Sequence, residues 1–211
     1  DYTHIPKQQR LNINLSSRKY DPPLDYRNII SCSDAGGGLE GRWALRSRLN
    51  SVWGYAPMGS IVGGFRHVGG FVHNLPALMP HKKYFDEHPE YYALVKGERQ
   101  RMAGRFPSHP CLSNPAVKDI VIISIKERIN AFQKKQNFAD DQLFFPVEYT
   151  DHHQICECEN CQKINKEEET DGGTLYRFLN AISDELSEEY PTLILTTLAY
   201  GATLKPPKNN L

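Results

Sequence analysis

The stretch Leu143-Phe-Phe-Pro-Val-Glu-Tyr-Thr150 predicts a strand, because it is a short apolar run of strand length. Upstream, Ser113-Asn-Pro-Ala-Val117 predicts a helix start, since Ser and Asn cap helices and Pro fits their first turn. Downstream, residues 174–190 have helical spacing and residues 193–200 are rich in β-forming residues. Strands that alternate with amphipathic helices indicate an α/β fold with a mainly parallel sheet.

Further segments extend this pattern toward the amino terminus. Residues 24–31 predict a strand, residues 40–50 a helix, residues 70–73 a short strand, and residues 88–95 a short helix. Such a parallel sheet either stays open or closes into a barrel, and the sequence has no Walker loop that would favour an open nucleotide-binding sheet. A complete barrel needs about 250 residues. The 211 residues therefore predict a partial (β/α)8 TIM-type barrel of about five βα units.

The composition argues against two classes of partner. The 25 Lys and Arg residues balance 25 Asp and Glu residues, so we expect no nucleic acid partner. The longest apolar stretches, such as residues 117–125, are too short to span a bilayer, so we expect no membrane insertion. The 11 Tyr and 8 His residues suit a polar, ring-shaped ligand such as a sugar.

Seven short motifs follow one another along nearly the whole chain. They are Asp25-Tyr-Arg27, Ala44-Leu-Arg-Ser-Arg-Leu-Asn50, Lys83-Tyr-Phe-Asp-Glu-His-Pro-Glu-Tyr91, Cys111-Leu-Ser-Asn-Pro115, Cys156-Glu-Cys-Glu-Asn-Cys161, Gly173-Thr-Leu-Tyr-Arg-Phe-Leu-Asn180, and Leu198-Ala-Tyr200 with Lys205-Pro-Pro207. Together they resemble the bacterial domain-of-unknown-function family 4838, which is related to the α-glucuronidase and β-hexosaminidase barrels. The resemblance implies a glycoside-hydrolase-like barrel, a carbohydrate substrate, and a periplasmic or extracellular location. It also implies that residues 1–22 end an accessory α/β domain and that residues 23–211 form the first part of the barrel.

Two carboxylates are candidates for catalysis. Glycoside hydrolysis needs one carboxyl group to protonate the leaving oxygen and another to activate water or attack. Asp151 stands just past the strand at residues 143–150, where a barrel places catalytic side chains, and related barrels carry an acid at the end of their fourth strand. Glu148 is the second candidate, although strand alternation places it on the opposite face. The alternative for Asp151 is that it caps a turn or orients a histidine.

Other polar residues near strand ends are candidates for binding the sugar. The resemblance implies that Arg27 grips a sugar through its guanidinium fork, and the alternative is an ion pair with a nearby aspartate. His73 could donate to a hydroxyl or carry a proton, and a structural role is its alternative. Tyr200 and His152 are further candidates for contacting the substrate.

The run Cys156-x-Cys158-x-x-Cys161 is the most distinctive local feature. Three thiols this close can converge on one zinc ion, and Cys111 or one of the adjacent histidines His152 and His153 could supply a fourth ligand. The alternative is a disulfide, which an oxidising compartment would favour. Cys-x-Cys is awkward for a local bridge, so the spacing favours structural zinc bound by these three cysteines and Cys111.

Three functions remain consistent with these residues. The first is a glycoside hydrolase with Asp151 as general acid or stabiliser and Arg27 as the sugar anchor. The second is a non-catalytic carbohydrate-binding barrel with a zinc-bound or disulfide-linked loop. The third is a metal-dependent hydrolase that uses His152 or His153.

Overall fold

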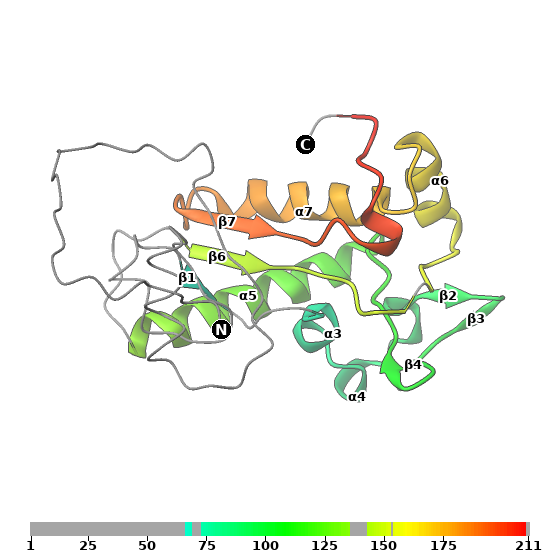
Figure 1. Ribbon diagram of the computed structural model, residues 1–211. Helices are drawn as coiled ribbons and strands as arrows, with labels where there is room; N and C mark the ends of the chain where they lie inside the picture. Colours follow the sequence, from blue (N-terminus) through cyan, green and yellow to red (C-terminus); the bar gives the residue numbers. More distant parts are fainter. Residues whose placement is uncertain (1–65, 69–72, 136–142, 153, 210–211) are drawn as a thin grey trace, which may run out of the picture.

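Figure 1 shows the chain as a computed structural model, which describes residues 66–68, 73–135, 143–152 and 154–209. The predictions for residues 1–22, 24–31 and 40–50, and for Arg27 and His153, lie outside these described residues. In the described part, helices and short strands alternate, which confirms a mixed α/β fold. Among the described helices, none is long and apolar enough to span a bilayer.

Three parallel strands form the central sheet. They are β1 (Arg66–His67), β6 (Leu143–Pro146) and β7 (Leu193–Thr196), in the order β1-β6-β7. All four residues of β6 are buried, as expected for a parallel strand covered on both faces. The Val147 N–H donates to the Thr196 carbonyl at 2.8 Å, which extends the ladder by one bond. The strand β6 therefore lies in the middle of the sheet.

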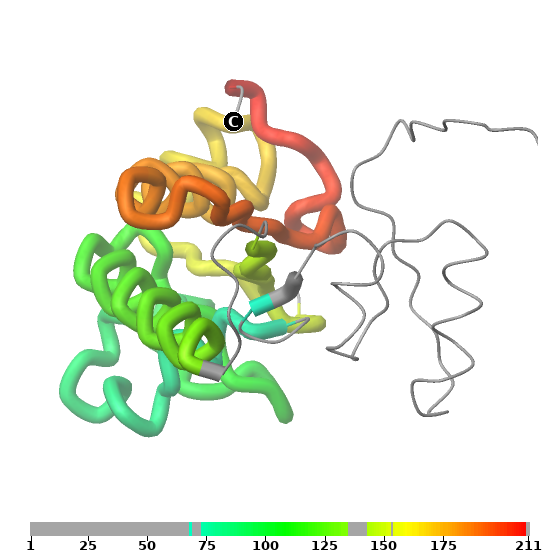
Figure 2. Tube along the Cα trace, turned by 90° about the vertical axis from the view of Figure 1, so that its left-hand side faces the viewer, coloured from blue at the N-terminus to red at the C-terminus, as the bar shows by residue number. Residues whose placement is uncertain are grey.

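Two long helices cover one face of this sheet (Figure 2). They are α5 (Pro115–Lys135) and α7 (Gly173–Leu186), and Asn114 caps α5 by accepting the Ala116 N–H at 3.0 Å. Residues spaced four apart on α5 face the core. There they pack against α7 and against alternate residues along β6. This core contains Val117, Val121, Ile125 and Ile129 of α5, Leu175, Leu179 and Ile182 of α7, and Leu143, Phe145 and Val147.

A small insertion separates β1 from α5. It contains α3 (Leu75–Leu78), α4 (His81–Tyr84), the 3-10 turn η2 (Pro89–Tyr91), and two hairpins, β2 (Leu94–Val95) with β3 (Glu98–Arg99) and β4 (Met102–Ala103) with β5 (Phe106–Pro107). The prediction of a helix over residues 88–95 is wrong beyond that single turn. Lys96 and Gly97 adopt left-handed backbone angles, φ 52° and 81°, which form the hairpin turn and draw Leu94 and Val95 into β2.

The strand ends also differ from the sequence expectations. The structure ends β6 at Pro146 and β7 at Thr196, although the β-rich sequence continues to Thr150 and Tyr200. Side chains replace the strand ladder here, because the Glu148 N–H donates to Asn74 Oδ1 at 3.1 Å and the Thr150 N–H donates to His109 Nε2 at 2.9 Å. The strand expected near residues 70–73 lies outside the described residues except for His73, and the structure describes the strand β1 at Arg66–His67.

The remaining elements lie between β6 and the end of the described chain. The helix α6 (Glu159–Glu167) precedes α7, and the short 3-10 turn η3 (Gly201–Thr203) follows β7. The turn between α6 and α7 holds the segment after η3, because the Thr170 hydroxyl donates to the Lys205 carbonyl at 2.9 Å and the buried Glu168 accepts the Asn209 N–H at 3.1 Å. The loop after β6, α6 and η3 thus all lie beyond the carboxyl ends of the strands (Figure 1).

A pair of isoleucines on α5 tests this packing. Ile125 is fully buried, so we expect Ile125→Ala to lower the free energy of unfolding by about 2–5 kcal/mol. Ile123 lies on the same helix but is 56% exposed, and Ile123→Ala should change the stability by less than about 0.5 kcal/mol. Urea unfolding of both variants measures the difference. Equal losses would contradict the assignment of the α5 core face.

Candidate functional site

Polar side chains gather where the parallel strands β1 and β6 end. His73 follows β1, while Glu148 and Asp151 follow β6. Because carboxyl ends of adjacent parallel strands meet at one edge of a sheet, residues 75 or more positions apart become neighbours there. The structure therefore brings together three of the residues that the sequence predicts for the site.

His73 links the two carboxylates. Its Nε2 lies 3.3 Å from Asp151 Oδ2, and its Nδ1 lies 2.7 Å from the Tyr149 carbonyl oxygen. Its backbone N–H donates to Glu148 Oε2 at 3.1 Å, and its φ of 57° is unusual for a residue other than glycine. These contacts hold the imidazole between the end of β6 and the Asp151 side chain.

Glu148 and Asp151 differ in their exposure. The Asp151 side chain is 50% exposed and reaches solvent, whereas Glu148 is 2% exposed. Burial raises the pKa of Glu148, and the hydrogen bond from the His73 N–H opposes that rise in part. Asp151 is thus the carboxylate that a ligand can reach, and Glu148 binds the backbone that positions His73.

A stack of three rings supports the loop that carries Asp151. The His109 ring lies between Tyr149, at 4.2 Å between centroids, and His152, at 3.8 Å. His109 is 1% exposed, and its Nε2 accepts the Thr150 N–H at 2.9 Å. Burial, and secondarily the nearby His152, lowers the pKa of His109 to about 2, so the ring is neutral at physiological pH.

The remaining predicted ligand contacts have different surroundings. Tyr200 follows β7, is 59% exposed, and lines a small cavity of about 20 Å³ together with Asp151 and His152. A cavity of this volume holds roughly one water molecule. The His152 ring packs on His109, and its Nε2 lies 3.2 Å from the Pro107 carbonyl oxygen. The structure thus places Tyr200 and His152 beside Asp151.

Four cysteines converge beside this site. Their Sγ atoms all lie within 4.8 Å of one another, and the shorter separations are 3.6 Å from Cys111 to Cys158 and to Cys156, and 3.9 Å from Cys111 to Cys161. A disulfide requires about 2.05 Å, so these four cysteines are free thiols. Thiolates placed tetrahedrally about 2.3 Å from a zinc ion lie about 3.8 Å apart, which these separations match. The four cysteines could therefore hold a metal ion.

The cysteines come from separate elements. Cys111 precedes α5, Cys156 and Cys158 lie in the loop after β6, and Cys161 lies in the first turn of α6. Hydrogen bonds from the thiols of Cys156 and Cys161 lower the pKa of the Cys111 thiol. A bound ion would consequently join the start of α5 to the loop that carries Asp151.

Three neighbouring groups surround the thiols. The Leu94 N–H donates to Cys156 Sγ at 3.3 Å, the Arg99 Nη1 lies 3.9 Å from the same sulfur, and the Ser113 hydroxyl lies 3.1 Å from Cys161 Sγ. Such contacts orient metal ligands and offset the charge of several thiolates. Within the part of the chain that the structure describes, the four cysteines are the one group of three or more potential ligands close enough to hold a metal.

The sequence does not predict the roles of three residues at these sites, although it marks Ser113 as part of a helix start. These residues are His109, Arg99 and Ser113. Each contacts a residue at least 41 positions away, and the contacts depend on how the two hairpins and the start of α5 fold. Arg27, predicted to anchor the sugar, lies outside the described residues.

Comparisons with known proteins give two findings. The family model described as "Domain of unknown function (DUF4838)" matches residues 1–211. Among solved structures, the chain is similar to the "Crystal structure of GH36 alpha-galactosidase AgaB from Geobacillus stearothermophilus", with 15% sequence identity and a TM-score of 0.34. That match covers 54% of this chain and 14% of the other, so the chain spans a small part of that protein. No curated protein matches the sequence.

The cysteine cluster predicts a measurable metal content. Protein purified without chelator should contain about one metal ion per chain, as a closed site of four thiolates would hold. Cys161→Ser should remove this ion, whereas Cys32→Ser, at the fifth cysteine of the chain, should retain it. Elemental analysis with a thiol count measures both. Metal-free native protein with two oxidised thiol pairs would contradict the metal site.

The buried imidazole of His109 predicts how stability depends on pH. In the unfolded chain a histidine titrates near pH 6.5, but the folded-state pKa is about 2, so the unfolded state binds more protons between these values. The stability that His109 contributes is thus present above pH 6.5 and is lost as the pH falls. His109→Gln keeps an acceptor for the Thr150 N–H and removes the titration. Urea midpoints below pH 6.5 should decline less steeply in this variant, and parallel declines would contradict the buried neutral ring.

Proposed function

The chain belongs to the DUF4838 family, and from that premise we propose that it forms part of a glycoside-hydrolase-like (β/α) barrel that acts on a carbohydrate. Asp151 acts as general acid or stabiliser of the reacting sugar, and His73 controls the proton at its carboxylate. This assignment rests on the geometry of His73, Asp151 and Tyr149 at the carboxyl edge of the sheet.

The observation that carries the proposal is the pair of contacts made by the His73 ring. A carbonyl oxygen only accepts hydrogen bonds, so the 2.7 Å contact with Tyr149 assigns a hydrogen to Nδ1. The other nitrogen, Nε2, faces Asp151, and a hydrogen bond between them needs one proton there. That proton belongs either to an imidazolium beside a carboxylate or to a carboxylic acid beside a neutral ring. Both forms can donate it to a glycosidic oxygen.

The distance between His73 Nε2 and Asp151 Oδ2 is one that is expected in an enzyme without bound substrate. The 3.3 Å separation is longer than the 2.7–2.9 Å of a charge-assisted N–H···O bond. Catalytic hydrogen bonds are often long before substrate binds and shorten in the complex. The exposed half of the Asp151 side chain leaves its carboxylate accessible to a sugar.

Glu148 is best suited to positioning His73. It is buried, and its carboxylate accepts the His73 N–H instead of facing solvent. Its catalytic role stays a prediction, and in this proposal the second carboxylate that hydrolysis requires comes from outside the described residues. Arg27, which also lies outside the described residues, stays the proposed sugar anchor in the strand expected at residues 24–31.

The arrangement of the strands supports the barrel. The strands β1, β6 and β7 are neighbours in chain order, and α5 and α7, which connect them, lie on one face of the sheet (Figures 1 and 2). In a (β/α) barrel the strands likewise follow one another around the sheet in chain order, and every helix lies outside it. We also propose the division into residues 1–22 of an accessory domain and residues 23–211 of the barrel.

We propose that the four cysteines hold a structural zinc ion. The chemistry of four thiolates and the tetrahedral separations fit zinc, which in a site closed by protein ligands is structural. Its ligands Cys156 and Cys158 end the loop that carries Asp151, so the ion limits the movement of that loop. Bound metal also protects thiols from oxidation, which is compatible with the proposed periplasmic or extracellular location.

A second candidate function is a non-catalytic carbohydrate-binding barrel. The observation that favours it is the small cavity beside Asp151, which at about 20 Å³ has room for roughly one water molecule and not for a sugar ring. In that case Asp151 and His73 would bind a hydroxyl at the rim of the site.

Replacement of Asp151 tests both candidates. In the full-length protein, Asp151→Asn removes the proton-carrying carboxylate and should lower turnover of a nitrophenyl glycoside about 10²- to 10⁴-fold. Asp119→Asn makes the same change at an exposed position on α5 and should leave turnover unchanged. Near-native turnover in Asp151→Asn would reject the catalytic role. Saccharide binding that survives the change, without hydrolysis by either form, would establish the second candidate.

A further inference from the structure

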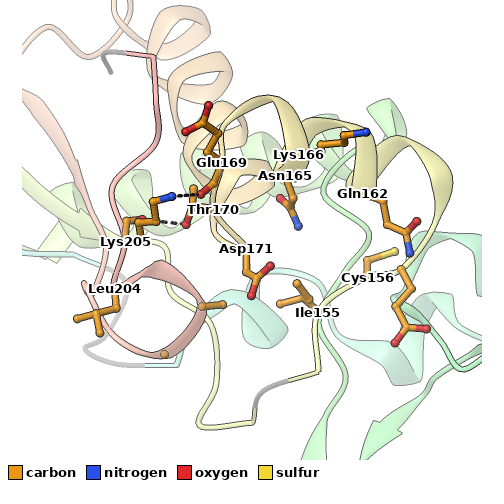
Figure 3. Close-up of a pocket in the computed structure, with 13 residues that line it drawn as sticks. Ile155, Cys156, Gln162, Asn165, Lys166, Glu169, Thr170, Asp171, Leu204 and Lys205 are labelled. Carbon is orange, nitrogen blue, oxygen red and sulfur yellow. Dashed lines mark hydrogen bonds between the residues drawn. The ribbon is translucent and has the colours of Figure 1, made fainter.

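A groove of about 1110 Å³ lies between α6 and the segment that contains η3 (Figure 3). The loop after β6 supplies Ile155, the end of α6 and the turn that follows supply Asn165 and Asp171, and the segment after β7 supplies Leu204. The groove is separate from the small cavity beside Asp151, but Ile155 and the turn at η3 line both. The two spaces therefore adjoin each other at the carboxyl edge of the sheet.

The size of the groove favours an extended ligand. Pockets for single small molecules measure about 300–1,000 Å³. This groove is larger and open, whereas the cavity beside Asp151 holds about 20 Å³. A ligand that reaches Asp151 and extends into the groove would have several units.

Charges of both signs line the groove and nearly balance, with Glu157, Glu169 and Asp171 against Lys166 and Lys205. Glu157 accepts the Lys96 N–H at 2.7 Å, Glu169 pairs with Lys208 at 2.7 Å, and the Lys205 ammonium donates to the Glu169 carbonyl. This leaves little net field for a polyanion, so the lining disfavours nucleic acid and strongly acidic polymers.

Within the described residues, the side chains of Gln162, Lys166 and Asp171 remain available for a ligand in the groove. Within the described part of the chain, neither the Gln162 amide nor the Asp171 carboxylate makes a hydrogen bond or an ion pair, and both residues are exposed. Figure 3 places Asp171 between Leu204 on one side and Gln162 on the other. A carboxylate and an amide accept and donate to hydroxyl groups. Leu204, which is 71% exposed, and Ile155 add an apolar surface against which the faces of sugar rings can pack.

We propose that this groove binds the extended part of a neutral oligosaccharide whose reacting end lies at Asp151. The inference rests on the proposed function, because it names the substrate as a chain of neutral sugars. Asp171 accepts hydrogen bonds from hydroxyl groups of the bound chain, and Gln162 forms the wall on α6.

The length of the saccharide provides the test. The full-length protein is titrated by calorimetry with neutral gluco-, xylo- and galacto-oligosaccharides, from disaccharide to hexasaccharide. In the wild type, affinity for at least one series should rise with chain length as more units enter the groove. Gln162→Trp fills the groove and should remove most of that rise, lowering the affinity for the longest member about tenfold or more. Gln133→Trp makes the same change at an exposed position on α5 and should have no effect.

A second variant tests ligand binding in the groove without adding a bulky side chain. Asp171→Ala removes a charged acceptor and should also lower the affinity for the long members about tenfold, with little change for the disaccharide. Wild-type affinities in both groove variants would overturn the groove assignment and leave the role of Asp151 standing. Failure of the wild type to bind any member would overturn the groove and the carbohydrate function together.

Discussion

The hydrogen-bond ladder that holds β6 between β1 and β7 is the constraint on which the rest of the structure depends. Because both neighbours run parallel to β6, all three strands deliver their following residues to one edge of the sheet. His73 after β1 and Asp151 after β6 meet there, and Tyr200 arrives from β7. The core under the sheet, formed by α5 and α7, keeps this edge in place.

The loop between β6 and α6 is held by several interactions along its short length. It leaves the sheet at Pro146, receives support from the buried His109 ring at Thr150, and reaches the cysteine cluster at Cys156. Between these supports lies the exposed carboxylate of Asp151. An exposed side chain on a loop thereby gains much of the rigidity that it would have on a strand.

The sequence predicts the regular elements and the cysteine site better than the surroundings of Asp151. The helix α5 follows from its Asn-Pro start and its apolar spacing, and the thiols of Cys156, Cys158 and Cys161 are close simply because they are close in sequence. The contact of His73 with Asp151 depends on strand adjacency, which only the assumed parallel sheet suggests. His109 could not be predicted, because its role depends on contact with a loop 41 positions away.

The positions of the four cysteines along the sequence bear on how the chain folds. Three of its thiols lie within one short segment, whereas Cys111 is 45 to 50 residues away from them in sequence, on the far side of α5 and β6. If these cysteines bind a metal ion, the local segment would bind it first, with an incomplete set of ligands. Its coordination would be completed only when α5 and β6 have docked, so the last metal–sulfur bond would form only in a correctly assembled βα unit and would then hold that unit closed.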